Sequence, residues 1–147
     1  MAETNQQPSQ QTTMYDWIGG EQGVRKLVDR FYEIMDQDEE AKTIRAMHKQ
    51  DLSEIKNGLF EYLSGWLGGP PLYIMKHGSP CITKPHAPFK IDQAASDAWM
   101  HCITKAMEDV AIEEKYRKML TPAFQRMCDT LMNSWFYSSS ASQKKGA

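Results

Sequence analysis

The sequence predicts an all-α protein built as a single domain. Apolar residues recur at the i, i+3, i+4, i+7 spacing of a buried helix face, most clearly at Val24, Leu27, Val28, Phe31 and Met35. Clusters of glycine and proline separate the helical stretches, and no stretch alternates in the manner of a β-strand. The chain has 147 residues, of which 41% are hydrophobic, so it is long enough to bury one core.

Four helices are expected in the first half of the chain. They cover residues 15–18, 24–35, 38–47 and 51–67. Asp38 is placed to cap the third helix, and Asp51 begins the fourth with Glu54 three positions later, the spacing of a capping box. The sequence Gly68-Gly69-Pro70-Pro71 ends the fourth helix, because proline lacks an amide donor and glycine favours chain reversal.

The second half begins with an irregular segment over residues 70–89. It contains five of the seven prolines, so no helix of normal length is expected there. A long irregular segment inside a compact domain often carries function. Asp92 is placed to cap a following helix, and a last helical region covers 113–136. Within that region Thr121-Pro122 either starts a new helix or kinks the existing one.

Both ends of the chain are expected to be disordered around a domain that covers residues 14–137. Residues 1–13 are rich in Gln, Thr and Pro and contain no apolar segment, so we interpret them as neither a signal peptide nor a helix. Residues 138–147 are rich in Ser, Gln and Lys, which is typical of an unstructured tail.

Composition limits the classes of function. The formal net charge is −2 with both signs interleaved, which is unlike the basic stripe that binds nucleic acid. No apolar run approaches the length of a membrane span. Cys81, Cys102 and Cys128 are widely separated, which favours reduced thiols in a cytoplasmic protein. We therefore expect neither a nucleic acid nor a membrane as a partner.

His86 is the first polar residue that a helical core does not explain. It stands in Lys-Pro-His-Ala-Pro-Phe, where two prolines restrict the backbone. Neutral imidazole is a common metal ligand, so the residue alone leaves two interpretations open, a solvated loop histidine or an iron ligand. A zinc site with His77 and Cys81 is disfavoured, because the ligand spacing is unusual and a fourth ligand would have to come from afar.

Tyr32 and Trp99 are the second feature. Each places a hydrogen-bond donor within an apolar helix face, where a buried donor needs a partner. Taken alone, both residues are better explained by packing in the core.

Five motifs then make the sequence resemble a known family. They are Tyr15-Asp-Trp-Ile-Gly-Gly, Arg30-Phe-Tyr, Gly68-Gly-Pro, His86-Ala-Pro-Phe and Asp97-Ala-Trp. With these motifs, the stretch from Tyr15 to Asn133 closely resembles the truncated haemoglobins, specifically their group II, or O type. The last three motifs are highly specific in this order and spacing. The resemblance implies a truncated globin fold, a two-over-two helical sandwich around a haem.

The resemblance also implies a set of site residues. It makes His86 the proximal ligand of the iron of haem b (iron protoporphyrin IX). Tyr32 and Trp99 match residues that face a bound ligand on the distal side, and His48 matches a variable distal position. Ile55 falls where many globins place a distal histidine, and Leu59 lies one turn further on. Contacts with the haem are implied for five more residues, of which Tyr73 and Lys90 often reach the propionates: Leu63, Tyr73, Phe89, Lys90 and Ile91.

The implied function is the binding of O2 and other diatomic ligands, CO and NO, at a histidine-bound iron. Tyr32 and Trp99 are expected to donate hydrogen bonds to the partial negative charge on bound O2. His48 is expected as a third donor or as a sixth ligand of ferric iron. The alternative is a haem enzyme with peroxidase-type or nitrogen-oxide detoxifying activity, which needs a reductase or other electron donor. No catalytic residue is assigned, and we expect a monomer or weak dimer.

Overall fold

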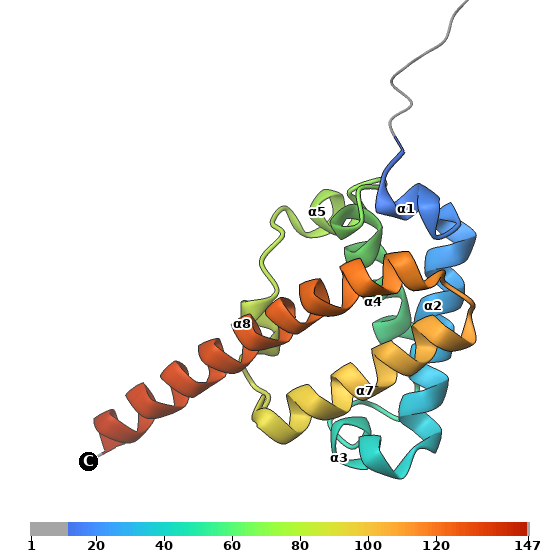
Figure 1. Ribbon diagram of the computed structural model, residues 1–147. Coiled ribbons are helices and arrows are strands. Elements are labelled where there is room, and N and C mark those ends of the chain that lie inside the picture. Colours follow the sequence, from blue (N-terminus) through green and yellow to red (C-terminus); the bar gives the residue numbers. More distant parts are fainter. Residues whose placement is uncertain (1–11, 147) are drawn as a thin grey trace, which may run out of the picture.

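The computed structural model describes residues 12–146 and contains only helices, turns and irregular segments in that range (Figure 1). The predicted all-α class is therefore confirmed, while the expectation for residues 1–11 lies outside the described residues. The elements in chain order are α1 (Met14–Trp17), α2 (Gly20–Gln37), the 3-10 helix η1 (Glu39–Ala41), α3 (Lys42–Arg45), α4 (Ser53–Trp66), α5 (Leu72–His77), α6 (Thr83–His86), α7 (Gln93–Asp109) and α8 (Glu114–Gly146).

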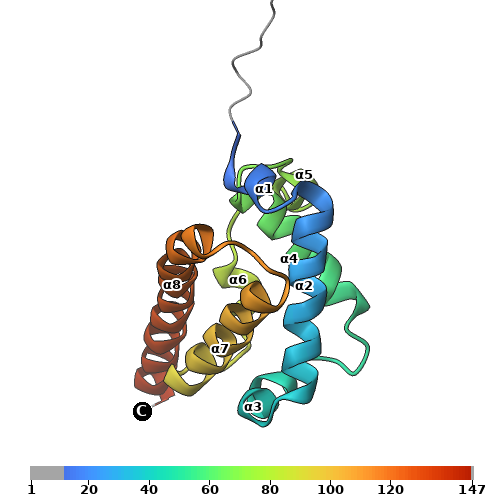
Figure 2. The same ribbon diagram turned by 45° about the vertical axis from the view of Figure 1, so that its right-hand side comes forward.

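Four long helices form two layers. Helix α2 packs against α4, and α7 packs against α8, while α2 also contacts α7 and so joins the two pairs. In Figure 2, α7 and α8 lie together on the left and α2 and α4 lie together on the right. This is the two-over-two arrangement that the resemblance implies.

The core lies between these layers. Helix α2 supplies its largest share, because apolar residues at helical spacing turn one face of α2 inward. Each fully buried aliphatic or aromatic side chain contributes about 1.5–3 kcal/mol relative to an exposed one. The largest side chains with almost no exposed surface are Phe31, Phe124, Leu27, Ile34, Met35, Leu63, Ile103 and Met107.

Helix α1 packs on the glycine pair that follows α4. Gly68 has a φ of +99°, in the left-handed region that favours glycine. At Gly69, a Cβ atom would collide with the ring of Tyr15, so the ring packs directly on the glycine backbone. The Tyr15 amide donates to the Leu67 carbonyl at 2.9 Å. The Tyr15 motif and the Gly68-Gly-Pro motif are thus two halves of one contact.

The helix starts differ in part from the sequence prediction. Asp92 caps α7 as predicted, since its carboxylate accepts from the Ala95 amide at 2.9 Å. The predicted capping box at Asp51 is wrong. Asp51 accepts from the Ser53 amide and hydroxyl, whereas Glu54 pairs with Lys49 at 3.6 Å instead of reaching back. A capping box forms at α1, where the cap is Thr13, a residue expected to be disordered.

The irregular segment holds two short helices, α5 and α6, of six and four residues. Its prolines and Gly78 keep both helices short, as the sequence predicts. No side chain from residue 68 to residue 94 is buried. The segment therefore lies on the surface of the fold and contributes no core residue.

Helix α8 is longer than predicted. Pro122 lies inside it and neither starts a new helix nor ends the old one, which answers the question that Thr121-Pro122 left open. The helix continues past Phe136 to Gly146, where the sequence predicts an unstructured tail from residue 138. None of the helices within residues 12–146, α8 included, combines the length and apolarity that crossing a membrane requires.

Candidate functional site

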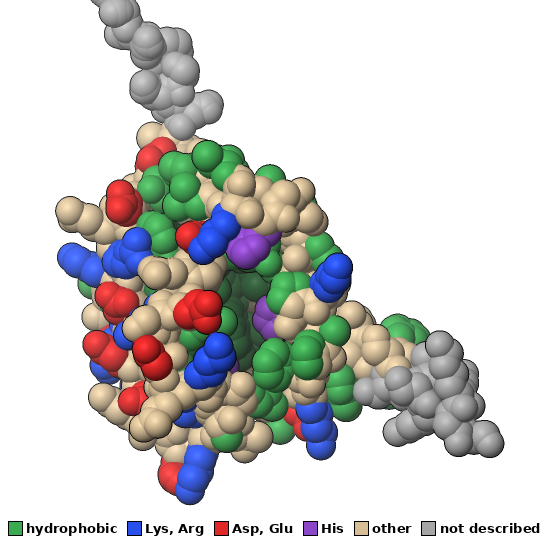
Figure 3. Space-filling model, turned by 180° about the vertical axis from the view of Figure 1, so that it is seen from behind, with side chains coloured by type: hydrophobic (Ala, Val, Ile, Leu, Met, Phe, Trp, Pro, Cys, Tyr) green, Lys and Arg blue, Asp and Glu red, His purple; other side chains and the backbone are tan. Residues whose placement is uncertain are grey.

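A hollow opens in the face of the molecule that is turned away in Figure 1. Figure 3 shows that its walls are mainly hydrophobic and that histidine side chains lie along it. Apolar walls with a few polar groups are typical of cofactor sites. The residues that the sequence predicts for such a site come from α2, α4, α5, α6, α7 and the segments that follow α3 and α6.

His86 is the last residue of α6 and is held in one orientation. Its Nδ1 lies 2.6 Å from the Ile82 carbonyl oxygen. A carbonyl can only accept, so Nδ1 carries the proton and the Nε2 atom of the neutral ring is left bare. Leu131 and Trp135 of α8 line, together with His86, a small space of about 10 Å³. A bare Nε2 with a fixed second nitrogen is the usual state of a metal-binding histidine.

Tyr32 lies on α2 with only 4% of its surface exposed. Its ring meets the rings of Phe31 and His48 edge-on, at centroid distances of 4.9 and 5.9 Å. Burial raises the pKa of the Tyr32 phenol, and no hydrogen bond contributes to that shift. The phenol therefore keeps its proton at neutral pH and remains a donor.

Trp99 lies on α7 and joins the two layers. Its ring is 5.0 Å from that of Phe31 and 5.6 Å from that of Phe124, measured between ring centroids. It is half-buried, so part of the indole remains accessible. Because Phe31 also contacts Tyr32, the structure brings Tyr32, Trp99 and His48 into one aromatic cluster.

His48 is half-buried and its ring is also fixed by a carbonyl. Its Nδ1 lies 2.8 Å from the Ile44 carbonyl oxygen, so Nδ1 is the donor and Nε2 is bare in the neutral ring. In the neutral ring the free Nε2 atom can only accept a hydrogen bond, whereas the sequence-based expectation made His48 a donor. Burial lowers the pKa of His48, although the bond to Ile44 opposes this, and positive charge on Arg45 and His86 lowers it further.

Arg45 clamps the segment that carries His48. Its guanidinium donates to the Asp36 carboxylate at 2.8 Å and to the carbonyls of Lys49 and Gln50 at 3.0 Å each. These bonds tie the residues on both sides of His48 to the end of α2, the helix that carries Tyr32.

The apolar residues predicted for the site lie in different environments. Ile55 on α4 and Phe89 after α6 are 41% and 38% exposed, which is high for large apolar side chains. Leu59 and Ile91 are half-buried. Leu63 is fully buried in the core and has no exposed surface.

The two residues predicted near haem propionates lie apart from the aromatic cluster. Tyr73 on α5 contacts the rings of Tyr62 and His77, at 5.4 and 4.4 Å between centroids. Lys90 is exposed, and its ammonium lies 3.8 Å from the Asp92 carboxylate that caps α7. Both residues belong to the surface segment between α4 and α7.

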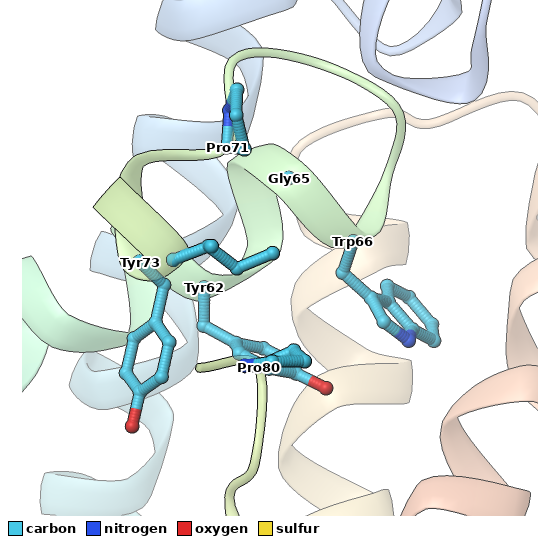
Figure 4. A pocket seen from close by; sticks show the side chains of 7 residues that line it. Tyr62, Gly65, Trp66, Pro71, Tyr73 and Pro80 are labelled. Atoms are coloured by element: carbon cyan, nitrogen blue, oxygen red, sulfur yellow. The ribbon is translucent and has the colours of Figure 1, made fainter. Parts of the chain in front are cut away.

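Sequence reasoning missed a cavity of about 210 Å³ beside α4. Figure 4 shows the rings of Tyr62, Trp66 and Tyr73 on the same side of α4, with Pro80 among them. The spacing of Tyr62 and Trp66 predicted only that they share a face of α4. The role of Arg45 was missed as well, because a side chain bonded to distant carbonyls leaves no mark on sequence periodicity.

Comparisons with known proteins identify the family of the chain. A family model described as bacterial-like globin matches residues 13–133. A group 2 truncated haemoglobin from Bacillus subtilis is 38% identical over 101 residues, covering 69% of this chain and 74% of the relative.

Solved structures lead to the same family. A cold-adapted truncated haemoglobin from the Antarctic marine bacterium Pseudoalteromonas haloplanktis superposes with a TM-score of 0.80 at 41% identity, covering 83% of this chain and 98% of that one. A group II two-on-two haemoglobin from Agrobacterium tumefaciens also superposes at 0.80, with 38% identity over 85% of this chain and 97% of that one. The chain therefore belongs to the bacterial-like globins and, within them, to the group II truncated haemoglobins.

Proposed function

We propose that this chain binds haem b, holds the iron through His86, and binds O2 on the face where Tyr32 and Trp99 donate hydrogen bonds. Membership of the globin family by itself implies a haem and small diatomic ligands such as O2. The observation that carries the finer assignment is the Nδ1 bond of His86 to the Ile82 carbonyl, which leaves Nε2 bare.

The side chains present fit a haem. A porphyrin needs apolar contacts, and it would cover Ile55 and Phe89, whose surface is otherwise largely exposed. When bound, it would supply an iron atom whose free position takes the diatomic ligand. Lys90 and Tyr73 lie on the surface segment, where they are suited to face the propionates. An exposed ion pair of this kind adds at most about 1 kcal/mol.

The partner of His86 favours ligand binding over O–O cleavage. A carbonyl acceptor leaves the imidazole neutral, whereas a carboxylate acceptor would make the ring more electron-rich. Cleavage of the O–O bond is promoted by electron-rich axial ligands. The reversible binding of O2 is therefore the better supported of the two functions that the sequence suggests.

On the distal side, two donors would stabilise bound O2. The Tyr32 phenol and the Trp99 indole both keep a proton and lie one ring apart across Phe31. Hydrogen bonds to developing charge in a dry site are stronger than in water. Ile55 offers no donor, so control of ligand release falls to the tyrosine and the tryptophan.

The setting proposed for this globin is the cytoplasm, with CO and NO as further ligands and a reductase to restore ferrous iron. None of the three cysteines forms a disulfide, which suits a reducing compartment. A truncated haemoglobin from Bacillus subtilis with a similar fold is described as oxygen-avid. That description supports O2 as the physiological ligand here.

The first experiment tests the iron ligand. His86→Ala protein should bind haem weakly and lose the five-coordinate ferrous spectrum that is expected of the wild type. His77→Ala removes an exposed histidine from the neighbouring helix α5 and should leave the spectrum unchanged. Absorption spectra of the ferric, ferrous and CO-bound forms provide the measurement. A normal Soret band and ferrous spectrum in the His86→Ala protein would disprove the assignment.

The second experiment tests the distal donors. Tyr32→Phe and Trp99→Phe should each speed O2 dissociation by roughly tenfold or more, because a hydrogen bond to a charged group is worth about 1.5–3 kcal/mol. CO dissociation should change far less, since bound CO carries less charge. Tyr116→Phe alters a tyrosine that stacks on Trp17 and serves as the control. Equal O2 dissociation rates in all four proteins would remove both residues from the ligand site.

A further inference from the structure

Helix α6 carries His86 but has little structure of its own. It has four residues, none of them buried, and Pro85 lies within it. So short a helix is not stable alone in water, because a single turn forms few hydrogen bonds for the residues that it orders. The orientation of His86 therefore depends on what α6 packs against.

Helix α8 provides that support. It packs against α6, and Figure 2 shows the two helices side by side. Thr83 and His86 are three residues apart, so they share one face of α6, and both line the small space beside α8. The residues of α8 that line it follow the i, i+3, i+4, i+7 spacing of one helix face: Leu131, Ser134, Trp135 and Ser138.

Trp135 is the largest side chain of this face. It is half-buried, whereas the next residue, Phe136, points elsewhere and is 57% exposed. The space left between the two helices is about 10 Å³, roughly the room of one water molecule, so α6 and α8 fit closely here. A tryptophan ring is large and rigid, and it therefore limits the movement of the helix turn beside it.

The contact continues beyond the part of the chain that the family model describes. That model matches residues 13–133, while Trp135 and Ser138 follow its end. Helix α8 extends without a break through this region and so carries the same face past residue 133. The support of α6 by Trp135 is thus a feature of this chain that membership of the family does not imply.

We propose that Trp135 is a positioning residue for His86. This inference rests on the haem-binding function proposed above. The Ile82 carbonyl fixes the imidazole ring at Nδ1, and Trp135 fixes the short helix that carries the ring. The two restraints together hold Nε2 in one direction, so that a bound haem iron would meet the imidazole in a single orientation.

Resonance Raman spectroscopy of the ferrous, ligand-free protein tests this role. The stretching band of the bond between iron and histidine depends on the orientation of the imidazole. Trp135→Leu keeps an apolar side chain for packing but removes the rigid ring, so the band should shift and broaden. Trp135→Phe restores an aromatic ring and should return the band toward that of the wild type. Phe136→Leu alters an exposed ring at the next position of α8 and should leave the band unchanged.

The haem-free protein provides a second measurement. The amides of Ala87 and Phe89 donate to the carbonyls of Lys84 and His86 within and just after α6. Hydrogen exchange at these two amides measures how often this turn opens. Exchange should be about tenfold faster in the Trp135→Leu protein than in the wild type, and unchanged in Phe136→Leu.

Two results would overturn the inference. An unchanged iron–histidine band in Trp135→Leu would show that Trp135 only stabilises the fold, even if urea denaturation detected a lower free energy of unfolding. Equal shifts in Trp135→Leu and Phe136→Leu would show a general loosening of α8 instead of a specific contact. In both cases the presence of the band shows that the proposed function still holds. Absence of the band from the wild type would disprove that function, and this inference with it.

Discussion

The three cysteine side chains differ in the pKa of the thiol, because their surroundings stabilise the thiolate to different degrees. Cys81 is exposed, and hydrogen bonds from the Thr83 hydroxyl and from the amides of Thr83 and Lys84 lower its pKa. Burial raises the pKa of Cys102 to about 12 and that of Cys128 to about 11. Only one of the three thiols is therefore expected to be reactive in the folded protein.

Titration with an aromatic disulfide at neutral pH measures this difference. The native protein should release one equivalent of chromophore quickly, and all three equivalents only in denaturant. Cys81→Ser should abolish the fast phase without altering the other two. Fast reaction of two thiols in the native wild type would show that Cys102 or Cys128 is more open than the structure indicates.

Residue types and motifs predicted His86, Tyr32 and Trp99 as site residues, but they did not show which ring nitrogen of His48 is free. The free nitrogen of His48 depends on which ring nitrogen meets the Ile44 carbonyl, and that is a property of backbone geometry. The same is true of Arg45, whose hydrogen-bond acceptors are the Asp36 carboxylate near the end of α2 and the carbonyls of Lys49 and Gln50 after α3. A single sequence shows which groups are present but not which carbonyl each group meets.

Periodicity predicted the long helices well because tertiary packing follows it. The apolar face of α2 and the Asp92 cap of α7 both agree with the structure. Local capping was harder to predict, since Glu54 pairs with Lys49 and not with the backbone at the start of α4. The end of α8 was missed because its last residues lack the apolar period on which the prediction relied.

The contact between α1 and the turn after α4 predicts how substitutions of glycine in this region change the stability of the protein. Gly69→Ala should destabilise the protein by about 1–3 kcal/mol, because the new methyl group collides with the Tyr15 ring. Gly58→Ala is the matched control, since nothing lies near its Cβ position and alanine favours the interior of α4 by up to about 1 kcal/mol. Urea denaturation measures both changes. A Gly69→Ala protein as stable as the wild type would mean that α1 does not rest on this turn.

For the whole molecule, haem should act as part of the fold. A ligand that binds only the native state at a thousand times its Kd adds about 4 kcal/mol, so haem removal should lower Tm by roughly 10 °C or more. Hydrogen exchange should rise mostly in residues 70–91, because that segment has no buried side chain of its own. Exchange in α7 should change least. A uniform increase over all helices would contradict this prediction.

The absence of buried side chains from residue 68 to residue 94 also bears on how such a protein can change in evolution. The segment that holds His86 can accept insertions and substitutions without repacking the core that α2, α7 and α8 build. Under the proposed function, mutations there would alter the proximal side of the haem site, whereas mutations in α2 or α7 would alter the proposed distal donors and the core together. Substitutions on the proximal face therefore have less effect on the free energy of unfolding. Substitutions on the distal face are constrained by stability as well as by chemistry.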